Sequence, residues 1–443
     1  MQRREFIRRA AASTLVLASD PFAGRAQAEL TGYRSLVCIF LLGGNDSFNL
    51  LVPRSSAEYS VYAQSRQNLA IPQASLLPIA PLTSDGTSYG LHPAATGIRD
   101  LFTTGQAAFV ANLGALIQPT SRQQAIEQSV PLPPQLFSHN DQQDQWQTIR
   151  GRRDLTTGWA GRTADLLEDA LSSQLMPLNA SLLGNLSWQA AASALPYSMG
   201  PMGAVEYLLL ALGVPNAARR RQAFEALLAA SQSSVYGRAF SAVNQRSLLY
   251  GDRVISAIGG APPIATPFPV DDLGGQLQIV SKLIASRDVL NMRRQVFIVA
   301  IGGFDTHDDQ NELQPGLFAK VSNNLAAFSA AMNELGVAND VTAFTMSDFG
   351  RTLTSNGDGT DHGWGSHQVV VGGAVRGGDI YGVMPSLEID GPDDVGGGRI
   401  VPRSSVDQYA ATLLRWFGLT EEQIDVAAPG LGAFTLRDLG FLA

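Results

Sequence analysis

Cysteine, histidine and long apolar segments are all scarce in this chain of 443 residues. The single cysteine, Cys38, cannot form an internal disulfide, so the stability of the fold must come from a packed core. Cys38 lies in the apolar run 36–42, which is typical of a buried strand and not of a lipid-anchored cysteine. Beyond residue 28 no apolar run is long enough to span a bilayer, so we expect no stable membrane span.

Positive charge is also in short supply. The formal net charge is −8, and removing residues 1–28 would take away five arginines and two acidic residues and leave −11. An acidic protein is repelled by a phosphate backbone, so we expect no nucleic-acid partner. The chain has no Walker loop, dinucleotide fingerprint or G-x-S-x-G elbow in a strand-to-helix context, so these motifs give no support to nucleotide binding or to α/β-hydrolase chemistry.

The N-terminus has the order of an export signal. The pair Arg3-Arg4 precedes a short apolar run, residues 10–19, and small residues at Ala26 and Ala28 form an A-x-A cleavage site. The adjacent arginines resemble the twin-arginine signal, which is read by the twin-arginine translocation machinery. We therefore predict that residues 1–28 are a signal peptide and that the mature protein is periplasmic or secreted by a bacterium. The alternative is an ordinary basic N-terminus that precedes an apolar run.

Four of only five histidines lie in dense polar motifs. These motifs are Ser138-His139-Asn140-Asp141, Gly302-Gly-Phe-Asp305-Thr-His307 and Gly359-Thr-Asp-His362-Gly-Trp-Gly-Ser-His367. Imidazole nitrogen and carboxylate oxygen are the usual non-thiolate ligands of zinc, so the pattern predicts one metal site assembled from distant parts of the chain. The fifth histidine, His92, precedes a proline and is expected to be a structural turn residue.

Five short apolar runs are typical of buried strands, and they span residues 36–42, 107–111, 295–301, 341–346 and 369–375. Residues 318–335 carry apolar side chains at helical spacing, which predicts a helix with one buried face that ends at Gly336. A strand, a helix and a strand joined by short links form a βαβ unit. The pattern therefore predicts an α/β fold with a central, mostly parallel sheet flanked by helices.

The middle of the chain has a different composition. Segments 204–214 and 219–257 are rich in alanine, leucine and arginine at helical spacing, and the proline-rich connector 261–269 follows them. We expect residues 29–443 to form a single domain that carries a helical insertion over about 160–290.

Three aspartates follow predicted strands directly. Asp46, Asp305 and Asp348 come after the runs that begin at residues 36, 295 and 341. In open α/β sheets ligands bind at the carboxyl ends of the strands, so these carboxylates are expected to meet there. Each could instead cap the turn or helix that follows it.

The motifs resemble one family when they are read in order. They comprise the paired arginines, Gly-Gly-Asn-Asp-Ser-Phe-Asn at 43–49, Ser-His-x-x-x-x-Asp-x-Trp at 138–146, Thr-Gly-Trp-Ala-Gly-Arg at 157–162, Gly-Gly-Phe-Asp-Thr-His and Ser-Asp-Phe-Gly-Arg-Thr. This order resembles the twin-arginine-exported, sulfatase-like family of uncharacterised bacterial proteins in the alkaline phosphatase superfamily. The resemblance covers essentially the whole chain and implies an alkaline phosphatase-like fold.

The resemblance also implies a metal site and a nucleophile. Its metal ligands fall on Asp46, Asp305, His307, Asp348, His362 and His367. Its catalytic residues fall on Ser138 as nucleophile, on His139 as a further ligand or contact to the phosphate-type group, and on Arg351, or else Arg162, as the group that neutralises the non-bridging oxygens. The cofactor implied is a divalent metal, zinc before calcium or magnesium, as one or two ions.

Several positions depart from the superfamily pattern. Phe349 stands where alkaline phosphatases have a histidine after the late aspartate, and the sulfatase signature Cys/Ser-x-Pro-x-Arg is absent. Thr120 or Ser121 therefore remains an alternative nucleophile to Ser138, and residues 123–137 are expected to form an extra loop near the site.

Two functions remain open. The first is an exported metal-dependent hydrolase of phosphate or sulfate esters, with a small-molecule or glycan ester as substrate. The second is an exported binding or assembly protein that keeps the fold without the chemistry.

Overall fold

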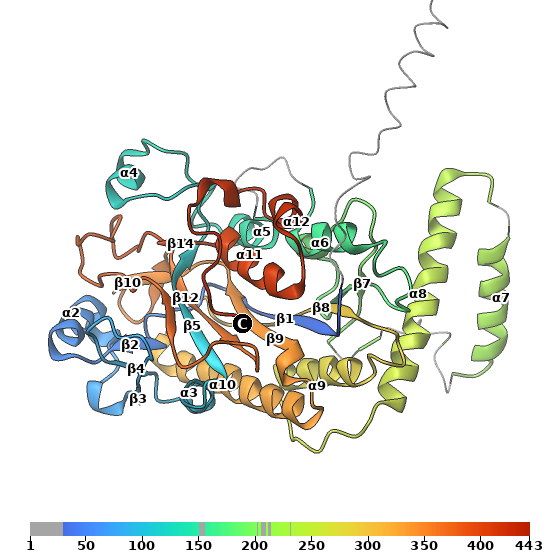
Figure 1. Cartoon of the computed structure of the whole chain (residues 1–443), viewed down its shortest axis with the longest axis horizontal. Helices are drawn as coiled ribbons and strands as arrows, with labels where there is room; N and C mark the ends of the chain where they lie inside the picture. Colours follow the sequence, from blue (N-terminus) through green and yellow to red (C-terminus); the bar gives the residue numbers. More distant parts are fainter. Residues whose placement is uncertain (1–29, 150–155, 202, 205–209, 211–213, 231) are drawn as a thin grey trace, which may run out of the picture. The chain divides into compact units, whose positions relative to one another are not determined.

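A nine-stranded sheet forms the centre of the computed structural model (Figure 1). The structure describes residues 30–149, 156–201, 203–204, 210, 214–230 and 232–443, and residues 32–443 form one compact unit. The strands run in the order β13-β5-β12-β9-β1-β8-β6-β7, and β14 pairs with β5. Their bounds are β1 Arg34–Leu41, β5 Ala107–Gly114, β6 Asn179–Ser181, β7 Tyr197–Ser198, β8 Arg294–Ile301, β9 Val341–Ser347, β12 Ser366–Val371, β13 Ile380–Gly382 and β14 Ser404–Ser405.

The sheet is mostly parallel, as the apolar runs predict. β1 pairs in parallel with both β8 and β9, and every residue from Leu36 to Leu41 is buried. The run at 369–375 differs from the expectation, because β12 is antiparallel to β5 and β9 and ends at Val371. A strand buried on both faces has the same apolar composition in either direction, so composition alone could not reveal its orientation.

Helices cover both faces of the sheet (Figure 1). One face carries α3 (Thr96–Thr103), α9 (Asp272–Ala285) and α10 (Gln310–Glu334), and the other carries α5 (His139–Thr148), α6 (Trp159–Leu167), α11 (Val406–Phe417) and α12 (Glu421–Ala427). The predicted helix 318–335 matches the C-terminal part of α10, which begins earlier, at Gln310, and ends at Glu334; Gly336 follows it with a left-handed φ of 68°.

The segment 160–290 is not wholly helical. It contributes β6 and β7 to the main sheet and α9 to one of its faces. The rest of the predicted insertion contains the helices α7 (Ala217–Ala229) and α8 (Val235–Gly260). α8 packs against α9 and contributes Val254 and Ala257 to the main core. Most of the predicted helix 204–214 lies outside the described residues, as does the predicted signal peptide.

Smaller elements surround the sheet. They are α2 (Ser56–Arg66), α4 (Arg122–Glu127), the small sheet of β2 (Leu51–Pro53), β4 (Tyr89–Leu91) and β3 (Leu77–Ile79), and the hairpin of β10 (Arg351–Ser355) and β11 (Thr360–His362). Among the described helices, none combines the length and the apolar character needed to cross a membrane.

Candidate metal centre

The loops after β1, β8 and β9 leave the sheet side by side. Leu41, at the end of β1, is in register with Ile301 on one side and Ser347 on the other. The backbone N–H of Gly43 donates to Asp348 at 3.2 Å. A Cβ on Gly43 would lie 2.4 Å from the backbone nitrogen of Asp305, so glycine is needed for this close approach.

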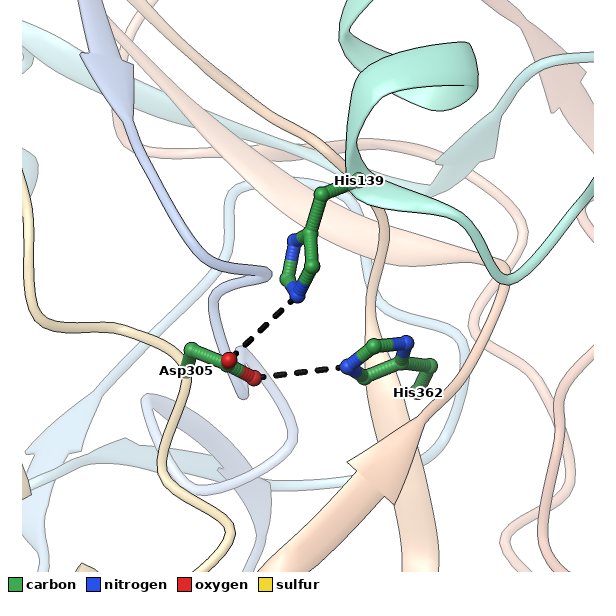
Figure 2. A group of neighbouring side chains, drawn as sticks. All are labelled: His139, Asp305 and His362. Carbon is green, nitrogen blue, oxygen red and sulfur yellow. Dashed lines mark ion pairs between the residues drawn. The ribbon is translucent and has the colours of Figure 1, made fainter.

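Three histidines surround Asp305 with their Nε2 atoms. The distances to the nearer carboxylate oxygen are 3.4 Å for His139, 3.1 Å for His307 and 3.4 Å for His362. Figure 2 draws Asp305 between His139 and His362, with both ion pairs marked. These side chains come from the N-terminus of α5, the loop after β8 and the end of β11, so distant segments build one cluster.

The other ring nitrogen of each histidine faces an acceptor. Nδ1–H of His139 donates to Asp348 Oδ2 at 2.7 Å, and Nδ1–H of His362 donates to the backbone carbonyl of Phe137 at 2.7 Å. Nδ1 of His307 lies 3.3 Å from a carboxylate oxygen of Asp361. A hydrogen bond that holds the proton on Nδ1 leaves the lone pair on Nε2, which is how metal-ligating histidines are oriented in proteins.

This donor set fits a divalent metal. One ligand atom each from His139, Asp305 and His362 lies within 4.8 Å of the others, and Nε2 of His307 lies 2.9 Å from Nε2 of His362. Two imidazoles and a carboxylate, with a third imidazole alongside, are ligands that suit zinc better than calcium or magnesium, which prefer oxygen.

Arg351 controls the charge state of Asp305. Its guanidinium donates to Asp305 Oδ1 at 2.7 Å and has no exposed surface. Partial burial raises the pKa of Asp305, but the hydrogen bond and charge of Arg351 and the nearby imidazoles lower it by more, so it lies below the ordinary 3.8. The carboxylate is therefore ionised over the working pH range, as a metal ligand must be.

His362 is held in its neutral form. Burial lowers the pKa of its imidazole, and the charges of Arg351 and His139 lower it further, against the opposing effects of the Phe137 carbonyl and Asp305. The ring of Phe349 packs against both imidazoles, with centroids 4.9 Å from His139 and 4.6 Å from His362. The phenylalanine that departs from the superfamily pattern is thus a wall of the cluster.

Asp46 is not part of this cluster. It is buried and forms an ion pair with Arg66 of α2, and Gln310 Nε2 donates to the same carboxylate oxygen at 2.6 Å. Arg66 also donates to Asn49 and to the backbone carbonyls of β10. The strand-end position of Asp46 is as expected, but Arg66 and Gln310 both contact its Oδ2, whereas its Oδ1 is buried and has no hydrogen-bond partner among the described residues.

A chain of hydrogen bonds joins Asp46 to the cluster. Gln310 accepts from the hydroxyl of Thr360 at 2.7 Å, and that hydroxyl accepts from Arg351 Nε at 3.2 Å. Arg351 then donates to Asp305. Asp46 therefore lies behind the three histidines and supports the side chains that hold Asp305.

His367 is also separate from the cluster. Its Nδ1 accepts the backbone N–H of Asn112 at 3.0 Å, so its proton must be on Nε2, which has no partner among the described residues. Phe48 packs edge-on against the ring, and burial lowers the pKa to about 3. A neutral imidazole whose lone pair is occupied has no atom for a metal.

Ser138 stands next to the cluster in the chain, as the residue before α5. Its hydroxyl donates to Asp141 Oδ2 at 2.8 Å. The alternative nucleophiles have local structural partners, because Thr120 donates to the Gln118 carbonyl and Ser121 caps α4.

Arg162 does not lie on the cluster. Its guanidinium donates to the backbone carbonyls of Thr148, Thr157 and Ala427, which join α6 to neighbouring segments. Arg351 contacts Asp305, Gly43 and Thr360, so both arginines expected to neutralise an ester anion hold protein groups instead.

Sequence reasoning missed the residues that support the cluster from behind. Gln143 Nε2 donates to Asp348 Oδ2 at 3.0 Å, and Arg399 donates to the carbonyl of His362 while its guanidinium lies 5.0 Å from the Phe137 ring centroid. Gln143 is one turn after His139, so the helical spacing in Ser-His-x-x-x-Gln could have indicated it. No pattern marks Arg66, because its partner Asp46 lies on a different element, or Arg399, because it contacts a backbone carbonyl and the distant Phe137 ring.

The fold and the cluster define an α/β protein with an imidazole–carboxylate centre at the carboxyl ends of its parallel strands. The chain belongs to the family described as "Protein of unknown function (DUF1501)", whose pattern matches residues 33–431.

Two solved structures are similar over most of the chain. The PsFucS1 sulfatase from Pseudoalteromonas sp. is 11% identical, with a TM-score of 0.35 over 93% of this chain and 73% of that one. Ps i-CgsB is 9% identical, with a TM-score of 0.35 over 92% of this chain and 77% of that one. No curated protein matches this chain.

Proposed function

We propose that this protein is an exported, metal-dependent hydrolase of phosphate or sulfate esters. The observation that carries the proposal is the orientation of three histidines, each with Nε2 toward Asp305 and Nδ1 toward an acceptor. A purely structural cluster has no need to bring three imidazole nitrogens to one carboxylate.

A single zinc ion fits the proposal best. His139, Asp305 and His362 would hold it, and His307 would complete the set or remain beside it. When bound, such an ion would polarise an ester oxygen and lower the pKa of the attacking hydroxyl. The Asp46–Arg66 ion pair argues against a second ion at Asp46, because a guanidinium already balances that carboxylate.

Ser138 is the proposed nucleophile. It precedes α5, where the helix N-terminus stabilises a developing anion, and it is bonded in sequence to a proposed ligand, His139. Its hydroxyl proton already points to the carboxylate of Asp141, which can accept that proton. Hydrogen bonds hold the three proposed ligands in place. Asp348 holds His139, the Phe137 carbonyl holds His362, and Arg351 holds Asp305.

A non-catalytic binding role is the second candidate. The observation that favours it is the commitment of Arg351 and Arg162 to protein acceptors, because an ester anion would then lack the arginine contact that the superfamily resemblance implies.

The test compares three variants of the purified mature protein. Asp305→Ala should lose bound metal and turnover, since it removes the central carboxylate. Ser138→Ala should keep its metal and unfold at nearly the same temperature, because one hydroxyl contributes about 1 kcal/mol, but it should lose turnover. Asp46→Asn is the matched control: it should keep its metal but lose about 3 kcal/mol or more of stability, since it leaves Arg66 buried without its counter-charge.

The measurements are metal content, melting temperature and hydrolysis of aryl phosphates and aryl sulfates. Metal retained by Asp305→Ala would overturn the proposed centre. Full activity in Ser138→Ala would move the nucleophile to Thr120, Ser121 or a water molecule. A metal-loaded wild-type protein that cleaves neither ester would favour the binding role.

A further inference from the structure

A cavity of about 580 Å³ lies beside α5, close to the candidate metal centre. Asn140, Gln143, Asp144 and Gln147 of α5 line one side, and Asn185 and Ser187 of the segment after β6 line the other. The volume falls within the range of cavities that hold small molecules in proteins.

The lining of this cavity is polar in a particular way. Its described side chains are amides, carboxylates and a hydroxyl, with one leucine and with no lysine, arginine or aromatic ring. Amide side chains donate and accept hydrogen bonds and carboxylates accept them, which matches neighbouring hydroxyl groups on a ring. The carboxylates of Asp141 and Asp144 disfavour an anion, and the amides and the hydroxyl of the lining offer several neutral hydrogen bonds, so an uncharged ligand rich in hydroxyls is complementary to this cavity.

A metal ion is a poorer occupant of the cavity. Among the described residues, the one cluster of three or more groups with ligand atoms close enough to hold an ion is that of His139, Asp305 and His362. The two aspartates of the cavity do not form a second such cluster, and amide side chains alone bind cations weakly.

Gln143 connects the cavity to the metal centre. It lines the cavity and donates to Asp348, which in turn holds His139. His139 and Gln143 are four residues apart on one face of α5, about 6 Å along the helix axis. A ligand in the cavity would therefore lie at a distance from the metal centre of about the width of one sugar ring.

We propose that this cavity binds an uncharged sugar unit of the substrate, next to the ester that the metal centre cleaves. The part of this inference that concerns catalysis rests on the proposed function, whereas sugar binding itself requires no metal. A neutral sugar held by amides would orient the charged ester toward His139 and Asp305 without adding positive charge to an acidic surface.

The experiment measures binding of neutral di- and trisaccharides of glucose, galactose, mannose and fucose by saturation-transfer NMR and calorimetry. The mature wild-type protein should bind at least one of them. Ser187→Trp, which fills the cavity from an exposed position, should abolish that binding, and Asn140→Ala should weaken it about tenfold, the effect of one lost hydrogen bond. Ser173→Trp, an exposed serine that does not line the cavity, is the matched control and should bind normally.

A His139→Ala variant separates the two proposals. If this variant binds sugar like the wild type but holds no metal, the proposal that the cavity binds sugar is supported, whether or not the protein cleaves any ester. If no saccharide binds the wild type, or if Ser187→Trp binds as well as Ser173→Trp, the inference is wrong. Calcium binding that is lost in Asp144→Asn, without any saccharide binding, would also overturn it.

Discussion

At the scale of single residues, burial divides the five histidines into two groups. The side chains of His139, His307 and His362 keep 22–38% of their surface exposed and surround Asp305. His92 and His367 are buried, and burial lowers their pKa values to about 4 and about 3. The buried pair is neutral in the folded protein, so both members make stability depend on pH.

The effect of His367 on stability can be predicted with its sign. Because its folded pKa lies below the unfolded value of 6.5, the stability that it contributes is complete above pH 6.5 and is lost as the pH falls toward 3. Between pH 6.5 and pH 5 the loss should be about 2 kcal/mol, at about 1.4 kcal/mol per pH unit. His367→Gln keeps an acceptor for the N–H of Asn112 but does not titrate.

The measurement is urea unfolding of the wild type and His367→Gln at pH 7 and pH 5, both with chelator. The wild type should lose more free energy of unfolding than the variant, by about 2 kcal/mol. His92 titrates equally in both proteins and cancels. An equal loss of unfolding free energy in the two proteins would show that the pKa of His367 does not change on unfolding.

At the scale of elements, the β10–β11 hairpin carries His362 to the centre through a close backbone contact. The N–H of Thr360 donates to the Thr306 carbonyl at 3.0 Å. A Cβ on Gly359 would lie 2.2 Å from the carbonyl oxygen of His307. The hairpin can approach the loop after β8 only because this residue has no side chain.

Gly359→Ala should therefore weaken metal binding without removing a ligand. The methyl group would push β11 away from the His307 loop, and displaced ligands typically cost tenfold or more in affinity. The control is Gly302→Ala in the same loop, where an added Cβ meets nothing within 4 Å. Competition with a chromophoric chelator measures both affinities, and equal values for the two variants would contradict the role of this contact.

The elements also show which parts of the site and the sheet could be predicted from the sequence. Asp305, His307 and His362 could be predicted because their strands, loops and ligand chemistry are all local patterns. The partner of Asp46 could not, because Arg66 lies on a separate helix and nothing in its neighbourhood distinguishes it from a solvated arginine. The direction of β12 was missed for a similar reason, since apolar composition records burial and not orientation.

At the scale of the whole molecule, the centre joins residue 139 to residues 305–307 and 362. No part of the chain shorter than about half its length contains all the proposed ligands, so the site forms only when distant segments over about half of the chain have folded together. A protein of this kind benefits from an export route that carries folded chains, as the predicted twin-arginine signal would provide.

The export prediction concerns residues 1–28, which the structure does not describe. Replacing Arg3 and Arg4 with lysine should leave the full-length precursor in the cytoplasm, because the translocation machinery reads the paired guanidinium groups. Replacing Arg8 and Arg9 with lysine is the matched control and should leave export intact. Cell fractionation followed by N-terminal sequencing gives both the compartment and the cleavage site after Ala28; export of the Arg3/Arg4 variant would point to a general secretory signal.

The Phe137 carbonyl that orients His362 has an evolutionary consequence. A main-chain acceptor is supplied by every amino acid, so position 137 can change its side chain across relatives while the imidazole keeps its tautomer. Asp348, which does the same for His139 through a side chain, has no such freedom. Related chains should therefore vary at position 137 and keep aspartate or glutamate at position 348. Substituting side chains one by one would reveal the support that Asp348 gives to His139 but not the support that the Phe137 carbonyl gives to His362.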